Sequence, residues 1–590
     1  MHQPTTPGRD ASPRLQDHAQ ERRTFRLDVP DVYNPVIAIV ESWAAEDPEA
    51  LAVLSLGPTG EVTAEQSAAD LARDARRAAR VLLDLGVGPG DRVFVMLPRI
   101  AEWYAVVLGA MRIGAVPMPG PNLLTPKDIA YRLEQAGAVA AVTDAAGLAK
   151  IDAIDAPLPA LRVRLLVRPD ASGEADGTAA DDNPGAVGGT DVVGGTDRPA
   201  GEDPAHWHDL ADLVAATAPD GGALPEAPTR RDDPLLTYFT SGTVSHPKMV
   251  THSQEYGLAH VPTARFWHDL RSGDRHWTVT DTGWAKAAWG GLFGQLHERA
   301  TIVQVALGRP DADTILRILA EHRITSFCAP PTLYRTLVQA DLGAYDLSAL
   351  RHCTSAGEPL NPEVIKVWAR GTGGLTVYDA YGQTETSVLV ANYRAVPVRP
   401  GSMGLPVPGW DVEVLDDEDR RAPDGEVGNI AVRTDGDRRP VGLFHGYDGN
   451  PEATAERFRG GWYFTGDKAA RDAEGYLWFE GRDDDVITSS AYRIGPFEVE
   501  SALVEHDAVV EAAVVGKDDP ERTQIVTAFV ILAAGVEASD ALARELQDHV
   551  KGLTAPYKYP REIHFVTELP KTVSGKIRRT ELRDRLRAQG

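Results

Sequence analysis

The sequence predicts an α/β protein, with a large amino-terminal domain of layered β-sheets and flanking helices and a small mobile α+β carboxy-terminal domain. Three observations support this prediction. Strand and helix patterns alternate through most of the 590 residues, and short strands separated by Gly and Asp turns follow Gly425. A compact unit of about a hundred residues follows Asp485. Alternation of strands and helices places helices outside layered sheets.

The individual elements follow from periodicity. Apolar residues recur at intervals of three and four over 63–85 and stop at Gly86, which predicts a single helix. In the large domain the patterns predict strands at 92–97, 234–239, 275–280 and 324–328 and helices at 102–111, 313–322, 331–340 and 361–370. Beyond Gly425 they predict strands at 428–432, 476–479, 508–515, 523–532 and 561–566 and a helix at 539–552.

Composition marks the domain boundaries. We expect a polar amino-terminal tail over 1–32, the large domain over 33–483 and the small domain over 484–590. Residues 170–204 are rich in Gly, Ala, Asp and Thr and contain GGTD twice, so they cannot bury enough apolar area to order themselves. We expect this segment to be a mobile surface insertion without a catalytic role.

Charge and cysteine content exclude several classes of protein. The formal net charge of −26 makes the surface repel nucleic acid and anionic membranes, so a site for an anionic nucleotide has to be a local basic pocket. Cys328 and Cys353 are the only cysteines. Both lie in apolar surroundings, which indicates core residues rather than a disulfide or a metal site. The sequence shows no signal peptide or membrane span, and the expected location is the cytoplasm.

The segment YFTSGTVSHPK at 238–248 carries the first functional motif. It joins a short apolar strand to a turn of hydroxyls and glycine and ends in a lysine, and these groups suit phosphate binding. The spacing differs from the GxxxxGK[ST] loop of nucleotide triphosphatases, and a Ser/Thr-rich surface turn is the alternative interpretation. The candidate phosphate-binding residues are Thr240, Ser241, Gly242, Thr243 and Lys248.

Further motifs follow in a fixed order. They are TDTGWAKAAW at 280–289, TSAGEPLNPEV at 354–364, YDAYGQTET at 378–386, YFTGDKAARDAEGYLWFEGRDDDVITSSAYRIGPFEVE at 463–500 and PKTVSGKIRR at 570–579. Together with the loop at 238–248, these motifs resemble the adenylate-forming superfamily of acyl-CoA synthetases, luciferases and peptide-synthetase adenylation domains. The resemblance runs from about Tyr33 to the end of the chain. The motifs at 280–289 and 354–364 resemble most closely the medium-chain acyl-CoA synthetase branch.

The resemblance implies roles for the motif residues. Thr384 and Glu385 would bind the α-phosphate and Mg²⁺, since oxygen ligands suit that ion. Lys576 would reach the reacting carboxylate and phosphate when the small domain rotates about Asp484, and a second rotation would bring the loop at 489–493 to the site for thioester formation. The adenine slot is assigned to Gly357, Glu358, Pro359, Asp379 and Tyr381, the ribose to Asp467 and Arg482, the acyl pocket to Trp284 and Gly382, and the path of coenzyme A to Ser490, Ala491, Tyr492 and Arg493.

Some of these residues also have plain structural interpretations. Tyr381 could serve only core packing, and Lys576 could be a solvated charge in a basic tail. Acetate-specific relatives carry a bulky indole at the position of Gly382, so the resemblance implies an acid larger than acetate.

Two stretches depart from the family pattern. Val244 and Ser245 stand where the phosphate loop of the family has a hydroxyl and a glycine. A donor is lost, and a positive φ at Ser245 would cost about 1–2 kcal/mol. Ala491 replaces a glycine beside the expected path of coenzyme A. The loop departures weaken the ATP half of the reaction, unless these loop tips face water and vary freely.

Three functions are therefore compared. The leading hypothesis is a complete acyl-CoA ligase that uses ATP, Mg²⁺ and coenzyme A. The alternative is a ligase specialised in converting a preformed acyl adenylate and coenzyme A into acyl-CoA and AMP, with a separate adenylating enzyme as its partner. The third is a non-catalytic acyl- or nucleotide-binding protein on the same fold. A homodimer is a candidate assembly, and neither nucleic acid nor a membrane is an expected partner.

Overall fold

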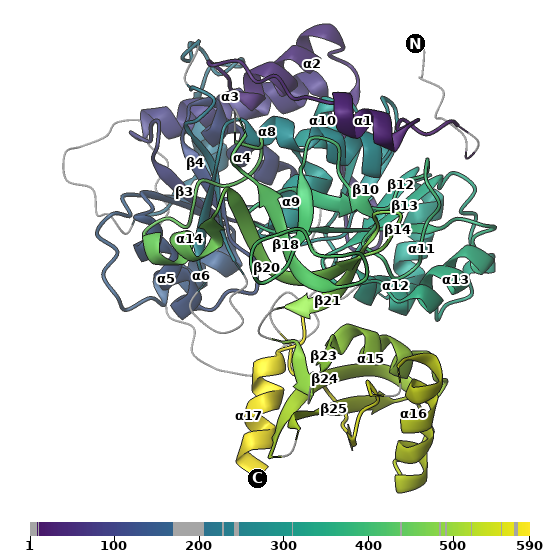
Figure 1. Ribbon diagram of the computed structural model, residues 1–590. Helices are drawn as coiled ribbons and strands as arrows, with labels where there is room; N and C mark the ends of the chain where they lie inside the picture. Colours follow the sequence, from purple (N-terminus) through teal and green to yellow (C-terminus); the bar gives the residue numbers. More distant parts are fainter. Residues whose placement is uncertain are drawn as a thin grey trace, which may run out of the picture.

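The computed structural model describes residues 9, 11–168, 206–226, 229–240, 247–308, 311–436, 439–482, 485–489, 492–520, 522–555, 557–571 and 576–589. A large layered domain lies above a small one, and β21 (Leu477–Arg482) points from the first toward the second (Figure 1). This arrangement confirms the predicted fold class. The predicted insertion at 170–204 lies outside the described residues.

The largest sheet has nine strands in the order β16-β15-β14-β13-β12-β10-β11-β1-β2. The pairs from β14 across to β1 are parallel, and antiparallel strands form both edges. Such a sheet is covered by helices on its faces and its central strands are apolar. In sheet order the strands are Leu405–Pro406, Val388–Ala391, Val377–Gly382, His352–Ala356, Ser326–Ala329, Arg275–Thr278, Thr301–Val305, Leu51–Leu56 and Val62–Ser67.

Two more sheets and a hairpin complete the large domain. A parallel sheet has the order β4-β3-β5-β6-β7, with strands Val116–Pro119, Arg92–Met96, Ala140–Thr143, Val163–Leu166 and His208–Asp209. An antiparallel sheet has the order β17-β18-β20-β19 with β21 beside β20, and its strands are Val412–Leu415, Val427–Arg433, Trp462–Arg471, Phe458–Arg459 and Leu477–Arg482. The hairpin pairs β8 (Pro234–Phe239) with β9 (Met249–Ser253). The residues between these two strands are those of the candidate phosphate loop.

Helices cover the sheets of the large domain (Figure 1). They are α1 (His18–Thr24), α2 (Ser42–Glu46), α3 (Ala68–Asp84), α4 (Ala101–Arg112), α5 (Pro126–Ala136), α6 (Ala145–Asp152), α7 (Leu210–Ala216), α8 (Tyr256–Ala259), α9 (Ala285–Gly291), α10 (Phe293–His297), α11 (Ala312–Glu321), α12 (Pro331–Leu337), α13 (Pro362–Gly371) and α14 (Pro451–Arg457). Short π-helical or 3₁₀ turns lie at Val36–Glu41, Thr263–Trp267 and Leu342–Ala344.

The predicted helix over 63–85 is wrong in its first turn. Residues 62–67 form β2, which pairs with β1, and α3 begins only after Ser67. The Ser67 side chain accepts a hydrogen bond from the Asp70 amide, and the Asp70 carboxylate accepts one from the Ser67 amide. This capping box fixes the helix start inside the apolar pattern. The other predicted elements are confirmed with ends that differ by a few residues.

The described residues of the small domain form one five-stranded sheet and three helices. Its sheet has the order β23-β22-β25-β24 with β26 beside β25, and the strands are Tyr492–Ile494, Ile487–Ser489, Thr523–Leu532, Val509–Asp519 and Glu562–Phe565. Its helices are α15 (Pro496–Val504), α16 (Asp540–Leu553) and α17 (Arg579–Gln589). A separate apolar cluster lies between sheet and helices, so this unit has its own core.

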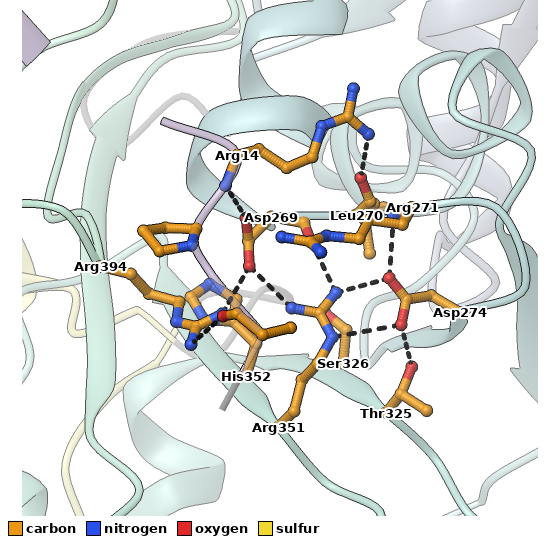
Figure 2. A network of polar contacts seen from close by, with 12 residues as sticks. Arg14, Asp269, Leu270, Arg271, Asp274, Thr325, Ser326, Arg351, His352 and Arg394 are labelled. Atoms are coloured by element: carbon orange, nitrogen blue, oxygen red, sulfur yellow. Dashed lines mark hydrogen bonds and ion pairs between the residues drawn. The ribbon is translucent and has the colours of Figure 1, made fainter. Parts of the chain in front are cut away.

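A buried ionic network fastens the amino-terminal segment to the large domain (Figure 2). The Arg351 side chain is 0% exposed and contacts Asp269 at 2.7 Å and Asp274 at 2.5 Å. Arg394 also reaches Asp269, at 2.8 Å, and the Arg14 backbone amide donates to the other Asp269 oxygen at 2.6 Å. Charges buried this deeply need several partners each.

The segment expected to be a polar tail thus has its own contacts. The Arg9 guanidinium donates to the carbonyls of Leu350 and Thr372, at 2.9 Å each. Leu15 is 0% exposed and belongs to the largest apolar cluster. The segment therefore packs on the large domain from Arg9 onward within the described residues.

The described residues contain neither a disulfide nor a membrane-spanning helix. Cys328 and Cys353 are buried and free, which confirms that they are core residues. Among the described residues, no helix combines the length and the apolar character that crossing a bilayer requires.

Candidate active site

The candidate site lies at the carboxyl ends of two neighbouring parallel strands. Residues 357–359 follow β13, Asp379 and Tyr381 lie in β14, and Thr384 and Glu385 follow β14 directly. Loops at this edge of a parallel sheet are the usual place for ligand binding. The sequence motifs at 354–364 and 378–386 are therefore brought together by strand pairing.

Asp467 is the centre of a hydrogen-bond network. Its Oδ2 accepts from the Tyr381 hydroxyl at 2.5 Å and from the Gln383 amide nitrogen at 2.7 Å. The Tyr463 hydroxyl donates to the Gln383 amide oxygen at 3.0 Å. Gln383 and Tyr463 were given no role from the sequence, although both lie inside quoted motifs. The network fixes the Asp467 carboxylate at the side of Tyr381.

Two cations lie near the same carboxylate. Arg482 stands directly opposite Asp467 in the ladder between β20 and β21, where side chains share a face. Burial raises the pKa of Asp467 above its ordinary value, against the hydrogen bond from Tyr381. The charges of Arg482 and Lys576 also act to lower this pKa. The charge of Lys576 in the small domain thus acts on the Asp467 carboxyl group of the large domain.

A third group surrounds Tyr447, which the sequence did not indicate. Its hydroxyl donates to Glu385 Oε1 at 2.7 Å, and the Lys248 ammonium lies 4.7 Å from the centre of its ring. Thr240 and Lys248 close the phosphate loop, because the Thr240 amide donates to the Lys248 carbonyl at 2.9 Å and the Lys248 amide donates to the Thr240 hydroxyl at 3.0 Å. The loop residues Ser241, Gly242, Thr243, Val244 and Ser245 lie outside the described residues.

Thr384 is held through its backbone. Its carbonyl lies 2.7 Å from His252 Nε2, and the His252 ring stacks on Tyr256 at 3.7 Å between ring centres. Burial lowers the pKa of His252 to about 3, so the ring is neutral and its Nε2–H donates to this carbonyl. The short turn from β14 to Glu385 is thereby anchored from β9.

Asp379 is a buried acceptor at the expected adenine slot. One carboxylate oxygen accepts from the Leu360 amide at 3.2 Å, and the other is buried without a hydrogen-bond partner among the described residues. Burial raises the pKa of Asp379 to about 8, against the amides of Leu360 and Ala380 and the charge of Lys286. An acceptor of this kind fits a ligand that brings an N–H donor.

Lys286, which the sequence analysis did not single out, lies beside this slot. Its ammonium donates to the Ala356 carbonyl at 3.0 Å. Burial lowers the pKa of Lys286, and the charges of Glu358 and Asp379 oppose that change. Glu358 itself pairs with Arg335 at 3.7 Å. Two residues assigned to the adenine slot, Glu358 and Asp379, thus lie near the charges of Arg335 and Lys286.

The acyl-pocket residues have a more constrained setting than expected. Trp284 is half-buried and precedes the first turn of α9. Gly382 sits at a bulge between β14 and β15, and a Cβ there would overlap the carbonyl oxygen of Ser387. This close backbone approach requires glycine whatever the size of the acid. Gly382 therefore carries less information about the substrate than the sequence comparison implies.

Of the side chains expected to serve coenzyme A, the structure describes Tyr492 alone. Tyr492 is 48% exposed and its ring stacks on Tyr557 at 3.9 Å. Ser490, Ala491 and Asp484 lie outside the described residues, as does the side chain of Arg493. The small domain thus presents Lys576 to the large domain while Tyr492 faces solvent.

A small domain whose lysine acts electrostatically on a buried carboxyl group of a large layered domain is consistent with the resemblance to adenylate-forming enzymes. The family model described as AMP-binding enzyme matches residues 40–447, and that described as AMP-binding enzyme C-terminal domain matches residues 498–576. The chain therefore belongs to the AMP-binding enzyme family, as an acyl-CoA synthetase.

Similar proteins share this architecture over nearly their whole length. The chain is 43% identical over 564 residues to the mitochondrial acyl-coenzyme A synthetase ACSM5 of Homo sapiens, covering 94% of this chain and 91% of that protein. The structure of the anthranilate CoA ligase AuaEII with anthranoyl-AMP gives a TM-score of 0.81 at 29% identity, covering 95% and 99% of the two chains. An acyl-CoA synthetase of Brucella canis gives a TM-score of 0.69 at 34% identity, covering 98% and 100%.

These findings confirm the leading hypothesis. The protein is an AMP-forming acid–CoA ligase that works through an acyl adenylate and uses ATP, Mg²⁺ and coenzyme A. The ligase restricted to one half-reaction and the non-catalytic binding protein are not favoured.

Proposed function

We propose that the reaction takes place between the two domains, with Lys576 acting in the adenylation step. The electrostatic influence of Lys576 on Asp467, which crosses from the small domain to the large one, supports this proposal most directly. In that step a carboxylate oxygen of the acid attacks the α-phosphorus of ATP, the bond from this phosphorus to the bridging oxygen breaks, and pyrophosphate leaves. The Lys576 ammonium would donate to the two oxygens that approach each other, where negative charge collects.

The remaining nucleotide contacts follow from the geometry of the large domain. Asp467 would accept from the ribose hydroxyls with Arg482 beside it, and Asp379 would accept from the exocyclic amine of adenine. Tyr381 would cover the base while its hydroxyl stays on Asp467. Burial raises the pKa of both carboxyl groups, and hydrogen bonds donated by a bound nucleotide would lower it by favouring the charged form.

Lys248 and Glu385 would serve the phosphates. The described residues contain no cluster of three or more His, Cys, Asp or Glu able to hold a metal ion. Glu385 would therefore share Mg²⁺ with phosphate oxygens, as this ion usually binds, and the bound ion would neutralise phosphate charge. Tyr447 orients the Glu385 carboxylate through its 2.7 Å hydrogen bond.

The second half-reaction requires another domain orientation. The thiol sulfur of coenzyme A attacks the acyl carbonyl carbon, and the bond to the adenylate oxygen breaks to release AMP. The segment 489–493 would then replace Lys576 at the site by rotation about Asp484. The exposure of Tyr492 in the present orientation is consistent with this exchange.

Lys576→Ala tests the division of labour. We expect pyrophosphate exchange to fall by about 100-fold or more, while conversion of a synthetic acyl adenylate and coenzyme A changes less than about threefold. Lys571→Ala is the matched control, because Lys571 lies in the same domain and pairs with Glu511 at 2.9 Å. Equal losses in both half-reactions would contradict the assignment of Lys576 to adenylation alone.

The substrate is proposed to be a carboxylic acid larger than acetate. Two similar structures are described as an anthranilate CoA ligase and a benzoate CoA ligase, and Trp284 offers an aromatic wall. A panel of acetate, butyrate, octanoate, benzoate and anthranilate, assayed for acyl-CoA formation, tests this proposal. Highest kcat/KM with acetate would contradict it.

Location and assembly are separate proposals. The cytoplasm is proposed from the sequence, whereas the similar ACSM proteins are described as mitochondrial; fractionation of source cells decides between compartments. A homodimer is tested by light scattering, and a separate adenylating partner by activity of the purified chain with ATP and a free acid.

A further inference from the structure

Arg457 is a cation of the site to which no role has been assigned. It is the last residue of α14, a helix that begins with Pro451 after the Asn450 cap and packs against β20. The Asn450 side chain accepts from the Ala453 amide at 2.9 Å. This short, capped helix points its carboxyl end, and hence Arg457, toward the motif that contains Asp467.

The chain leaves space for the Arg457 guanidinium directly over Gly466. Gly466 has a φ of +80°, and a Cβ at this position would overlap Arg457 Nη1. Both the positive φ and the close approach require glycine. The Arg457 guanidinium therefore lies against the backbone at Gly466, the residue that precedes Asp467.

The surroundings of Arg457 are the groups beside the phosphate loop. Burial acts against its charge, but Tyr447, Tyr463 and Glu385 raise the pKa of the Arg457 guanidinium above its ordinary value. Tyr447 is the shared neighbour, because the guanidinium lies at its hydroxyl and the Lys248 ammonium lies 4.7 Å from its ring centre. Lys248 and Arg457 thus stand on two sides of one tyrosine.

The carboxylates near Arg457 have other hydrogen-bond partners. Glu385 accepts from Tyr447 at 2.7 Å, and Asp467 accepts from Tyr381 at 2.5 Å and from Gln383 at 2.7 Å. Their positions are therefore fixed by neutral donors. A guanidinium kept charged at this place has the planar fork that matches phosphate oxygens.

We propose that Arg457 binds the β- and γ-phosphates of ATP and the departing pyrophosphate, as a second cation that acts with Lys248 across Tyr447. This inference rests on the proposed position of the phosphates beside Lys248.

Arg457→Gln tests the inference in the full-length enzyme. A charge-assisted contact to phosphate is worth about 10- to 100-fold, so we expect KM for MgATP in pyrophosphate exchange, and the inhibition constant of inorganic pyrophosphate, to rise by that factor. The reaction of a preformed acyl adenylate with coenzyme A involves no β-phosphate and is expected to stay within about twofold. Arg457→Lys keeps the charge but not the planar fork. Its two constants, KM for MgATP and the inhibition constant of pyrophosphate, are expected to lie between those of wild type and those of Arg457→Gln.

Arg459→Gln is the matched control. Arg459 lies two residues further along the chain, contacts the Phe464 ring at 3.5 Å and pairs with Asp419 at 3.3 Å. Its variant should therefore keep the wild-type KM for MgATP and the wild-type inhibition constant of pyrophosphate. If Arg457→Gln lowers both half-reactions equally, Arg457 only maintains the geometry of Asp467 and Glu385, and the inference is wrong. Unchanged pyrophosphate inhibition would also overturn it. Absence of exchange in the wild-type enzyme would instead refute the proposed adenylation activity.

Discussion

Arg351→Met isolates the contribution of the buried ionic network. Its guanidinium contacts Asp269 and Asp274 at 2.7 and 2.5 Å, and all three side chains are at most 2% exposed. After the replacement, Asp269 keeps its 2.8 Å contact with Arg394, and Asp274 keeps the Thr325 hydroxyl at 2.8 Å. Removing one partner of a buried ion pair lowers the free energy of unfolding by about 3–5 kcal/mol. Because both carboxylates keep other donors, we expect a loss of about 3 kcal/mol.

The assay is thermal and urea unfolding of wild type, Arg351→Met and the control Arg370→Met, whose side chain is 72% exposed. A loss of this size lowers Tm by about 3 °C in a domain of several hundred residues, and the control should change by less than about 0.5 kcal/mol. A loss below about 1 kcal/mol for Arg351→Met would refute the reasoning, because the two carboxylates would then not depend on this charge.

The same network predicts a dependence on pH. Burial acts to raise the pKa of Asp269, but His352 and Arg351 hold it below its ordinary value. A carboxyl group with a lowered folded-state pKa stabilises the fold above the pKa of the unfolded chain, near about 4, and this contribution is lost as pH falls further. The stability difference between wild type and Arg351→Met should therefore shrink on acidification, as measured by urea unfolding.

Two further predictions concern the acyl pocket and the domain junction. Gly382→Ala should lower kcat/KM about tenfold or more for acetate and butyrate alike, because the added Cβ displaces the Ser387 carbonyl. A loss confined to butyrate would show instead that the glycine only provides space for the larger acid. The second prediction concerns Glu480 at the domain junction, where burial raises its pKa to about 7, with Lys558 lowering and Glu498 raising it. Ionisation of Glu480 thus costs stability increasingly as pH rises from about 4.5 to about 7, so Glu480→Gln should raise Tm at pH 8 and leave it unchanged at pH 4; an equal change at both would contradict the role of this charge.

The fold was predictable where a helix or strand depends on the local sequence pattern. The strand at 523–532 and the helices after Asp311 and Asn361 follow from apolar periodicity and caps. Residues 62–67 could not be separated from the helix that follows, because the pairing with β1 that makes them a strand is a tertiary contact. The order of the nine-stranded sheet likewise depends on pairings between distant segments.

The candidate site was predictable only where motifs name residues. Asp467 and Glu385 come from short motifs, whereas Tyr447 has no such signal and is 62 residues from its partner Glu385 in the chain. Arg457 acquires its place only because α14 ends opposite Gly466. Such side chains are selected by packing geometry, which a single sequence does not reveal. Gly466 lies inside a quoted motif, but the sequence does not indicate that it leaves space for an arginine.

The docked amino-terminal segment has a consequence for synthesis on the ribosome. The Arg9 carbonyl accepts from Arg394, 385 residues later in the chain, and at about 5–20 residues per second that partner emerges about 20–80 s after Arg9. The segment that contains Arg9 therefore completes its contacts only after Arg394 has been synthesised. A bulky fusion at the amino terminus would interfere with this late closure more than one at the carboxyl terminus.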